Sequence, residues 1–373
     1  GTVEVNDLYD YTLNISNDYR LNDSHTLGFG LQTIYNDISY EYTVNDTINA
    51  IDEENSGLQT SAYLQDTWRI NDELTLTGGF RTTHFDLTNE IYFEPRLSAS
   101  YQLTERLKLK AAWGHYYQFV NRIVREDVSQ GSRDFWLLAD NKNSPVSFSE
   151  QFIAGMSYEV DGWLIDFEAY NKSLDGIVEF SNRQSATSLD DLGNTDFFFE
   201  GTGVARGFEW LIQKTSGKYK GWISYTLGEV VHDIPGISET PFYALHDTRH
   251  EINIVNTYQV GRWNLGATWV YGTGKPYTAP YGEYQLTTID GITNNYISVG
   301  GKNAFRLPDY HRLDLSANYK FKLGENGSGQ IGLSLFNFYN RENTWFKEFR
   351  VEEELVIETE VYLIGITPSL NFS

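Results

Sequence analysis

The stretch RLDLSANYKF, residues 312–321, shows most clearly how this chain folds. Its apolar and aromatic residues stand at every second position, and polar or charged residues fill the positions between them. Successive side chains of a β-strand point to opposite faces of the sheet, so this alternation separates the two kinds of side chain. We therefore predict a strand with one polar face and one apolar face, the latter formed by Leu313, Leu315, Ala317, Tyr319 and Phe321.

The same alternation recurs along almost the whole chain, in about fifteen segments. Most of these predicted strands run about 10–16 residues, whereas strands in soluble domains average about 5–6 residues. Fourteen residues extend about 46 Å, and a tilt of about 45° reduces this to about 33 Å, close to the hydrocarbon thickness of about 30 Å. The strands are therefore long enough to cross a bilayer. Besides residues 312–321, the segments are 11–20, 25–40, 58–70, 74–87, 92–103, 106–114, 148–160, 163–174, 204–214, 218–230, 249–260, 263–272, 330–340 and 358–372.

Composition excludes several classes of protein. The 373 residues carry a formal net charge of −23, which disfavours partners bound mainly through phosphates, so we expect no nucleic acid. No apolar run approaches the roughly 20 residues of a membrane helix, which excludes a helical membrane protein. Cysteine is absent, and with it disulfides, thiolate metal sites and cysteine nucleophiles.

The predicted connections alternate between tight turns and long polar loops. Turns such as Asp161-Gly162 and Gly261-Arg262 contrast with loops near residues 45–56, 121–146, 181–201, 232–245 and 276–304. Outer-membrane barrels have short periplasmic turns and long extracellular loops. The pattern predicts a single all-β domain over residues 1–373, an antiparallel up-and-down transmembrane β-barrel with outer-membrane lipid against its apolar face. A large soluble β-sandwich or solenoid with unusually long strands is the alternative.

Five segments resemble the C-terminal barrel of TonB-dependent outer-membrane receptors, particularly those of Bacteroidetes. They are FEPRLSASYQLTERLKLKAAWGHYYQF, GVARGFEWLIQKTSGKYKGWISYTLG, HDTRHEINIVNTYQVGRWNLGATWVYGTGKPYT, RLPDYHRLDLSANYKF and GLSLFNFYNREN. The resemblance implies a Gram-negative outer-membrane transporter that imports a scarce nutrient with inner-membrane energy. It implies 22 strands, a plug domain and a TonB-type partner, with a surface lipoprotein as a candidate accessory. A passive porin is the alternative function.

The chain departs from the family pattern at its N-terminal side. Neither a plug nor a partner motif precedes the first predicted strand, and about fifteen strands correspond to roughly the last two thirds of a 22-stranded barrel. An odd number of antiparallel strands does not close by antiparallel pairing, and open edges are costly in hydrocarbon. We therefore expect the chain to be part of a longer receptor, with the plug and the first strands absent.

Seven charged residues are predicted to face the lumen from their phase in the strands. They could bind the plug, guide a ligand or pair with one another, and mutual pairing is favoured because buried charges usually pair. They are Arg81, Arg96, Lys108, Lys110, Glu209, Arg312 and Asp314.

Two loops carry the ligand-binding candidates. The first combines cations and aromatic rings, which pair with anions and stack on ligands, although it could simply pack over the barrel mouth. Its candidates are Arg122, Arg125, Arg133, Phe135 and Trp136. The second loop holds Tyr277, Tyr281 and Tyr284, which could instead extend an aromatic belt.

We expect neither an enzyme, nor a cofactor, nor a metal site. Two acidic clusters, Asp46, Asp52, Glu53, Glu54 and Asp190, Asp191, Asp196, lack the spacing of a calcium loop and fit a solvated surface better. His246, Asp247 and His250 lie close together, but no motif places a nucleophile beside them.

Overall fold

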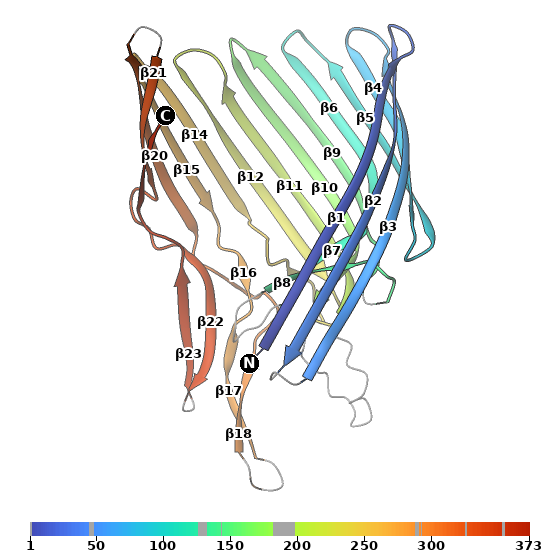
Figure 1. Cartoon of the computed structure of the whole chain (residues 1–373), viewed down its shortest axis with the longest axis vertical. Helices are drawn as coiled ribbons and strands as arrows, with labels where there is room; N and C mark the ends of the chain where they lie inside the picture. Colours follow the sequence, from blue (N-terminus) through green and yellow to red (C-terminus); the bar gives the residue numbers. More distant parts are fainter. Residues whose placement is uncertain are drawn as a thin grey trace.

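A computed structural model describes residues 2–44, 48–125, 133–142, 144–181, 198–287, 291, 293–324, 327–352 and 355–373. Within these residues, long strands lie side by side in chain order and curve into a barrel wall (Figure 1). Neighbouring strands of the wall are antiparallel throughout. No helix in the described part of the chain is long and apolar enough to cross a membrane. The all-β, up-and-down prediction is confirmed.

The wall has about fifteen strands, as the alternation predicted. In order they are β1 (Thr2–Arg20), β2 (His25–Val44), β3 (Ile48–Arg69), β4 (Leu74–Phe85), β5 (Glu90–Gln102), β6 (Leu107–Gln118), β9 (Ser147–Val160), β10 (Trp163–Phe180), β11 (Phe198–Lys214), β12 (Tyr219–Asp233), β14 (His250–Val260), β15 (Trp263–Gly272), β20 (Tyr310–Leu323), β21 (Gly327–Phe336) and β24 (Thr367–Phe372). Shorter strands lie in the long connections: β7 (Val120–Arg125), β8 (Arg133–Leu138), β13 (Phe242–Tyr243), β16 (Pro276–Tyr277), β17 (Pro280–Thr287), β18 (Thr293–Val299), β19 (Phe305–Arg306), β22 (Thr344–Glu352) and β23 (Leu355–Tyr362).

The two ends of the wall differ in their connections (Figure 1). At one end, β9 and β10 are joined by Asp161 and Gly162, whose φ angles of 48° and 77° are the left-handed values that a two-residue hairpin turn needs. At the other end, hairpins β17–β18 and β22–β23 project beyond the wall. The predicted contrast between the two ends is therefore confirmed for the connections after β6, whereas β2–β3 and β4–β5 are joined by short connections at this same end. The long connections mark the extracellular side.

The predicted loops over residues 45–56 and 276–304 contain more strand than expected. Strand β3 begins at Ile48 and continues the pairing with β2, so residues 48–56 belong to a long hairpin, at its end away from the short turns. Strands β16, β17 and β18 lie within the second loop. In both places cross-strand backbone pairing outweighs a polar local composition, because strand propensity depends strongly on the neighbouring strand.

The edges of the wall run in the same direction. In the described part of the chain β1 pairs with β2, β24 pairs with β21, and no pairing joins β1 to β24. Because the strands between them alternate in direction, β1 and β24 both run from the long loops toward the short turns. Antiparallel pairing of these two edges with each other is therefore impossible.

Register assigns the two faces of the wall. Leu315 of β20 lies opposite Ala267 of β15, in one outward apolar row, while Ser316 lies opposite Gly266 in the adjacent inward row. Large apolar side chains of the outward rows are exposed, as Leu13 is at 65%. In a membrane barrel this exposed face contacts lipid, and the inward polar face lines the lumen.

We predict that Leu315→Arg will impair assembly by about 2–4 kcal/mol, because the residue lies in the outward apolar row of β20, between Leu313 and Ala317. Ser316→Arg, one residue along and facing the lumen, is the control and should assemble normally. The measurement is the heat-modifiable gel mobility of the full-length protein. Equal defects in the two variants would show that the faces are assigned wrongly.

Candidate functional site at the mouth of the barrel

A hairpin formed by β7 and β8 lies across the extracellular end of the barrel (Figure 1). Arg125 in β7 pairs in parallel with Phe180 at the end of β10, and β8 contacts β1, β2 and β3 on another part of the wall. The main-chain N–H of Trp136 donates to Asn6 Oδ1 at 2.8 Å, and Asn6 Nδ2 donates to the carbonyl of Trp136 at 3.2 Å. The hairpin therefore bridges strands that are far apart in the sheet.

Aromatic packing holds this hairpin in place. The ring of Phe135 is fully buried and stacks on Tyr40 of β2 with centroids 4.0 Å apart. It also makes edge contacts with Phe180 and Phe198 of β10 and β11. We therefore assign Phe135 a packing role in the mouth, although the sequence suggested it as a ligand contact.

The other candidates of this loop have different surroundings. Arg122 forms an ion pair with Asp134 across the hairpin. Trp136 is 37% exposed, because its side chain lies on the opposite face of β8 from Phe135. The backbones of Arg125 and Arg133 are paired, and their side chains lie outside the described residues.

The tyrosines of the second loop fall into two groups. Tyr277 packs among other loops, with its ring parallel to Phe349 of β22 at 6.4 Å and tilted against Phe305 at 5.9 Å. Tyr281 and Tyr284, on strand β17, are exposed at 71% and 47%. Tyr277 thus joins β16–β19 to β22–β23, whereas Tyr281 and Tyr284 present their rings to solvent.

A buried ionic cluster joins three distant segments of the mouth. Glu179 lies at the end of β10, and its Oε2 forms an ion pair with Lys302 Nζ at 2.8 Å. Its other oxygen, Oε1, lies 3.4 Å from His232 Nδ1 of β12. All three side chains are nearly buried. Burial raises the pKa of Glu179, but the bond to His232 and the charge of Lys302 outweigh it and leave the pKa below its usual value. The carboxylate is therefore held ionised.

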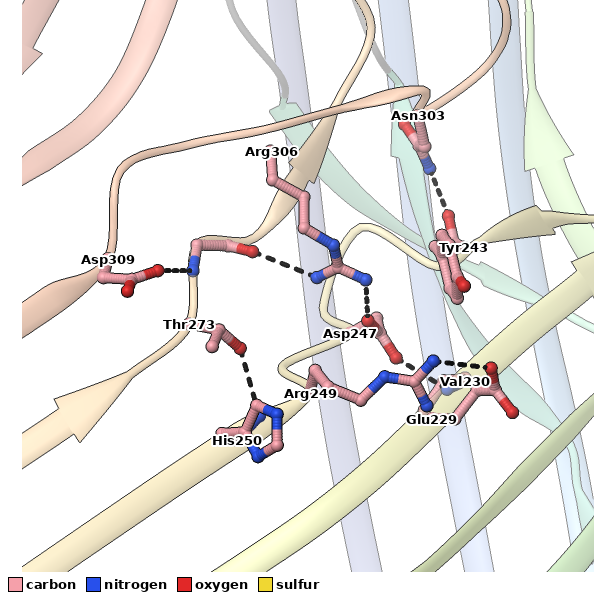
Figure 2. A network of polar contacts seen from close by, with 11 residues as sticks. Glu229, Val230, Tyr243, Asp247, Arg249, His250, Thr273, Asn303, Arg306 and Asp309 are labelled. Carbon is pink, nitrogen blue, oxygen red and sulfur yellow. Dashed lines mark hydrogen bonds and ion pairs between the residues drawn. The ribbon is translucent and has the colours of Figure 1, made fainter.

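A second network fixes the loop between β12 and β14 (Figure 2). Asp247, 1% exposed, accepts the N–H of Val230 at 2.7 Å and Arg306 Nη2 at 2.5 Å. Arg306 Nη1 donates to the carbonyl of Gly274 at 3.0 Å. Asp247 therefore has a structural role, because it ties its own connection to strand β12 and to the connection between β15 and β20. In the described residues no group of three or more His, Cys, Asp or Glu is arranged to hold a metal ion, and the acidic residues Asp46, Asp190, Asp191 and Asp196 lie outside them.

The lumen wall carries the charged residues predicted from strand phase. Arg81 Nη2 donates to Ser61 Oγ at 2.9 Å, and Lys110 Nζ lies 2.9 Å from Asp166 and 2.6 Å from Glu168. Arg96 forms an ion pair with Glu94, and Arg312 forms one with Asp314. Lys108 is exposed, and Glu209 of β11 lies opposite Glu168 of β10. The inner surface is thus polar and extensively paired.

Sequence reasoning missed Glu179, His232 and Lys302. They come from β10, β12 and the connection before β19, and no spacing along the chain links them. Only the folded mouth brings the three side chains together, and nothing in the composition of their segments signals burial.

We predict that Phe135→Ala will loosen the β7–β8 hairpin by about 3–5 kcal/mol, because a fully buried aromatic ring is removed. Trp136→Ala is the matched control, since that neighbouring side chain is partly exposed. Hydrogen exchange of residues 120–125 and 133–138 in the full-length protein should speed up much more in the first variant. Equal effects would contradict the anchoring role of Phe135.

We predict that the mouth loses stability at acidic pH through Glu179. A carboxyl whose pKa is lowered by folding contributes stability above its unfolded pKa, near 4.5, and loses it as pH falls through the folded pKa. Hydrogen exchange around residues 177–180 should therefore accelerate below about pH 4.5 after correction for intrinsic rates. Glu179→Gln should exchange faster at neutral pH and show less of this acid response, and an undiminished response would contradict the assignment.

Residues 2–340 match the family model described as TonB dependent receptor-like, beta-barrel. The comparison with curated proteins found no match. Three similar solved structures are the Pseudomonas aeruginosa receptor FpvA with pyoverdines (TM-score 0.65, 10% identity), the FrpB iron transporter of Neisseria meningitidis (0.62, 13%) and the copper transporter OprC (0.62, 13%). The alignments cover 98–100% of this chain but only 48–57% of those proteins, so it spans about half their length. The chain belongs to the TonB-dependent receptor β-barrel family of the Gram-negative outer membrane.

Proposed function

We propose that this chain is the barrel of an active outer-membrane transporter, which captures a scarce nutrient at the extracellular mouth and passes it through the lumen. The family match over residues 2–340 carries the proposal. The polar inner wall supports it, because a solute that crosses the barrel needs a hydrated path. Proteins of this family are transporters, and we assign no catalytic reaction to the chain.

We further propose that a plug and the contact with a TonB-type energy-transducing complex are supplied by sequence outside residues 1–373, as are the strands that complete the barrel. Two observations support this. The chain spans about half the length of the solved receptors, and its edges β1 and β24 run in the same direction. Each edge then requires a further antiparallel strand, because unpaired backbone groups are costly in hydrocarbon. The charged lumen wall would contact the plug.

For ligand capture we propose Trp136, Tyr281 and Tyr284, whose exposed rings offer stacking surfaces around the mouth. Arg122 stands on the same hairpin as Trp136 and would add charge to that surface. Ferric chelates are the first ligand class to test, since FpvA is seen with a ferric pyoverdine, and cobalamin, glycans and peptides follow. A surface lipoprotein is a candidate accessory.

We predict that deletion of the gene will abolish uptake of one nutrient from this panel and that the full-length gene will restore it. Uptake should stop when a protonophore removes the inner-membrane energy, whereas diffusion through a porin would continue. Trp136→Ala with Tyr281→Ala should weaken ligand binding by about tenfold or more, because each ring stacking contact contributes about 0.5–1.5 kcal/mol beyond its buried area. The control is Tyr258→Ala, an aromatic residue exposed on the outer face. Uptake that persists without inner-membrane energy would contradict active transport.

A further inference from the structure

The outward face of the barrel carries an ion cluster where the apolar surface ends. Arg206 of β11 alternates with Val204 and Phe208, which are 41% and 44% exposed on the outward face. In register, Arg206 lies opposite Glu229 of β12. Arg249, just before β14, completes the cluster, and Figure 2 shows it directed at Glu229.

The cluster has an excess of positive charge. Arg206 Nε and Nη2 donate to Glu229 Oε2 at 2.9 and 2.7 Å, and Arg249 Nη2 donates to Glu229 Oε1 at 3.0 Å. Two guanidinium groups therefore share one carboxylate. The side chains of Arg206 and Arg249 are 65% and 37% exposed, whereas that of Glu229 is 16% exposed. The outer surface of the cluster is consequently cationic, although the whole chain is strongly acidic.

The depth of the cluster matches the outer leaflet. Arg206 lies eight residues from Lys214, the last residue of β11 at the short-turn end. At about 3.3 Å per residue and a tilt of about 40°, this is a height of about 20 Å, near the upper limit of an apolar band about 25 Å tall. Lipid headgroups begin at this level.

An apolar groove leads directly to the two arginines. It has a volume of about 1290 Å³ on the outward face, and Arg206, Glu229 and Arg249 are among its lining residues. Trp113 and Phe152 stand along it. Its floor is low because four small side chains lie opposite one another on successive strands: Ala99, Ala111, Ala154 and Ala169.

We propose that this surface binds a phosphate-bearing, acylated lipid of the outer leaflet, with the phosphate on Arg206 and Arg249 and an acyl chain along the alanine-floored groove. Guanidinium groups form strong, directional bonds to phosphate. A free phosphate ion would match the arginines alone, whereas a lipid matches both the charge and the adjoining groove. The site is separate from the proposed ligand site, which faces the mouth.

The first test is native mass spectrometry of the full-length protein with bisphosphorylated lipid A. Wild type should retain one lipid, and Arg206→Gln with Arg249→Gln should bind it at least about tenfold more weakly, because charge-assisted bonds are lost. Lys214→Gln is the control, since it removes a cation from the same face of β11 at the opposite end. Equal retention by the arginine variant and wild type would overturn the proposal.

A second test separates the two parts of the site. Ala111→Leu with Ala154→Leu fills the groove, keeps the arginines and should also weaken retention, so it decides the question if the arginine variant does not assemble. Dephosphorylated lipid A should bind about tenfold more weakly than the phosphorylated form. Inorganic phosphate at millimolar concentration should not displace the lipid. Unchanged binding to the filled groove, or displacement by phosphate, would overturn the lipid assignment.

Discussion

Backbone hydrogen bonding without water is the constraint on which this structure depends. Hydrocarbon offers no partner for an N–H or a C=O group, so each strand that crosses the membrane must be paired along both edges. The strands between β1 and β24 meet this requirement by antiparallel pairing with both neighbours, as β10 does with β9 and, apart from a bulge at Gly176, with β11. Strand length, tilt and the short turns follow, because only long and adjacent antiparallel strands keep the pairing continuous through the bilayer.

Once the strands are paired, the period of two determines where charge is placed. Side chains turned outward within the hydrocarbon meet lipid and are mostly apolar, whereas those turned inward meet water or another part of the protein. Lys110 is an inward-facing cation whose charge is paired within the protein, since its ammonium group contacts Asp166 and Glu168 of β10. At the mouth water is present again, and the wall gives way to hairpins, a buried aromatic cluster and the ion cluster around Glu179.

The features of the fold that depend on local alternation could be predicted from the sequence. The alternation in residues 312–321 and its repeats predicted the all-β class, about fifteen strands and two faces of unlike polarity. The prediction from local pattern was wrong where pairing with a distant strand determines the structure. The acidic residues after Ile48 were predicted as a loop, because their own segment does not indicate that they pair with β2. Phe135 looked like a ligand contact because burial by Tyr40, from a strand far away in sequence, leaves no signal in the chain.

Contacts from the outer and inner surfaces converge on the connection between β12 and β14. Glu229, which holds the two outward arginines, is followed by Val230, whose N–H donates to the buried carboxylate of Asp247 (Figure 2). Asp247 in turn pairs with Arg306 of the loop beside the mouth. Since Arg249 is only two residues from Asp247, the same connection is fixed from outside by Glu229 and from inside by Arg306. The rim between β12 and β14 is therefore held by hydrogen bonds and ion pairs on both of its faces, and this network supports one side of the mouth.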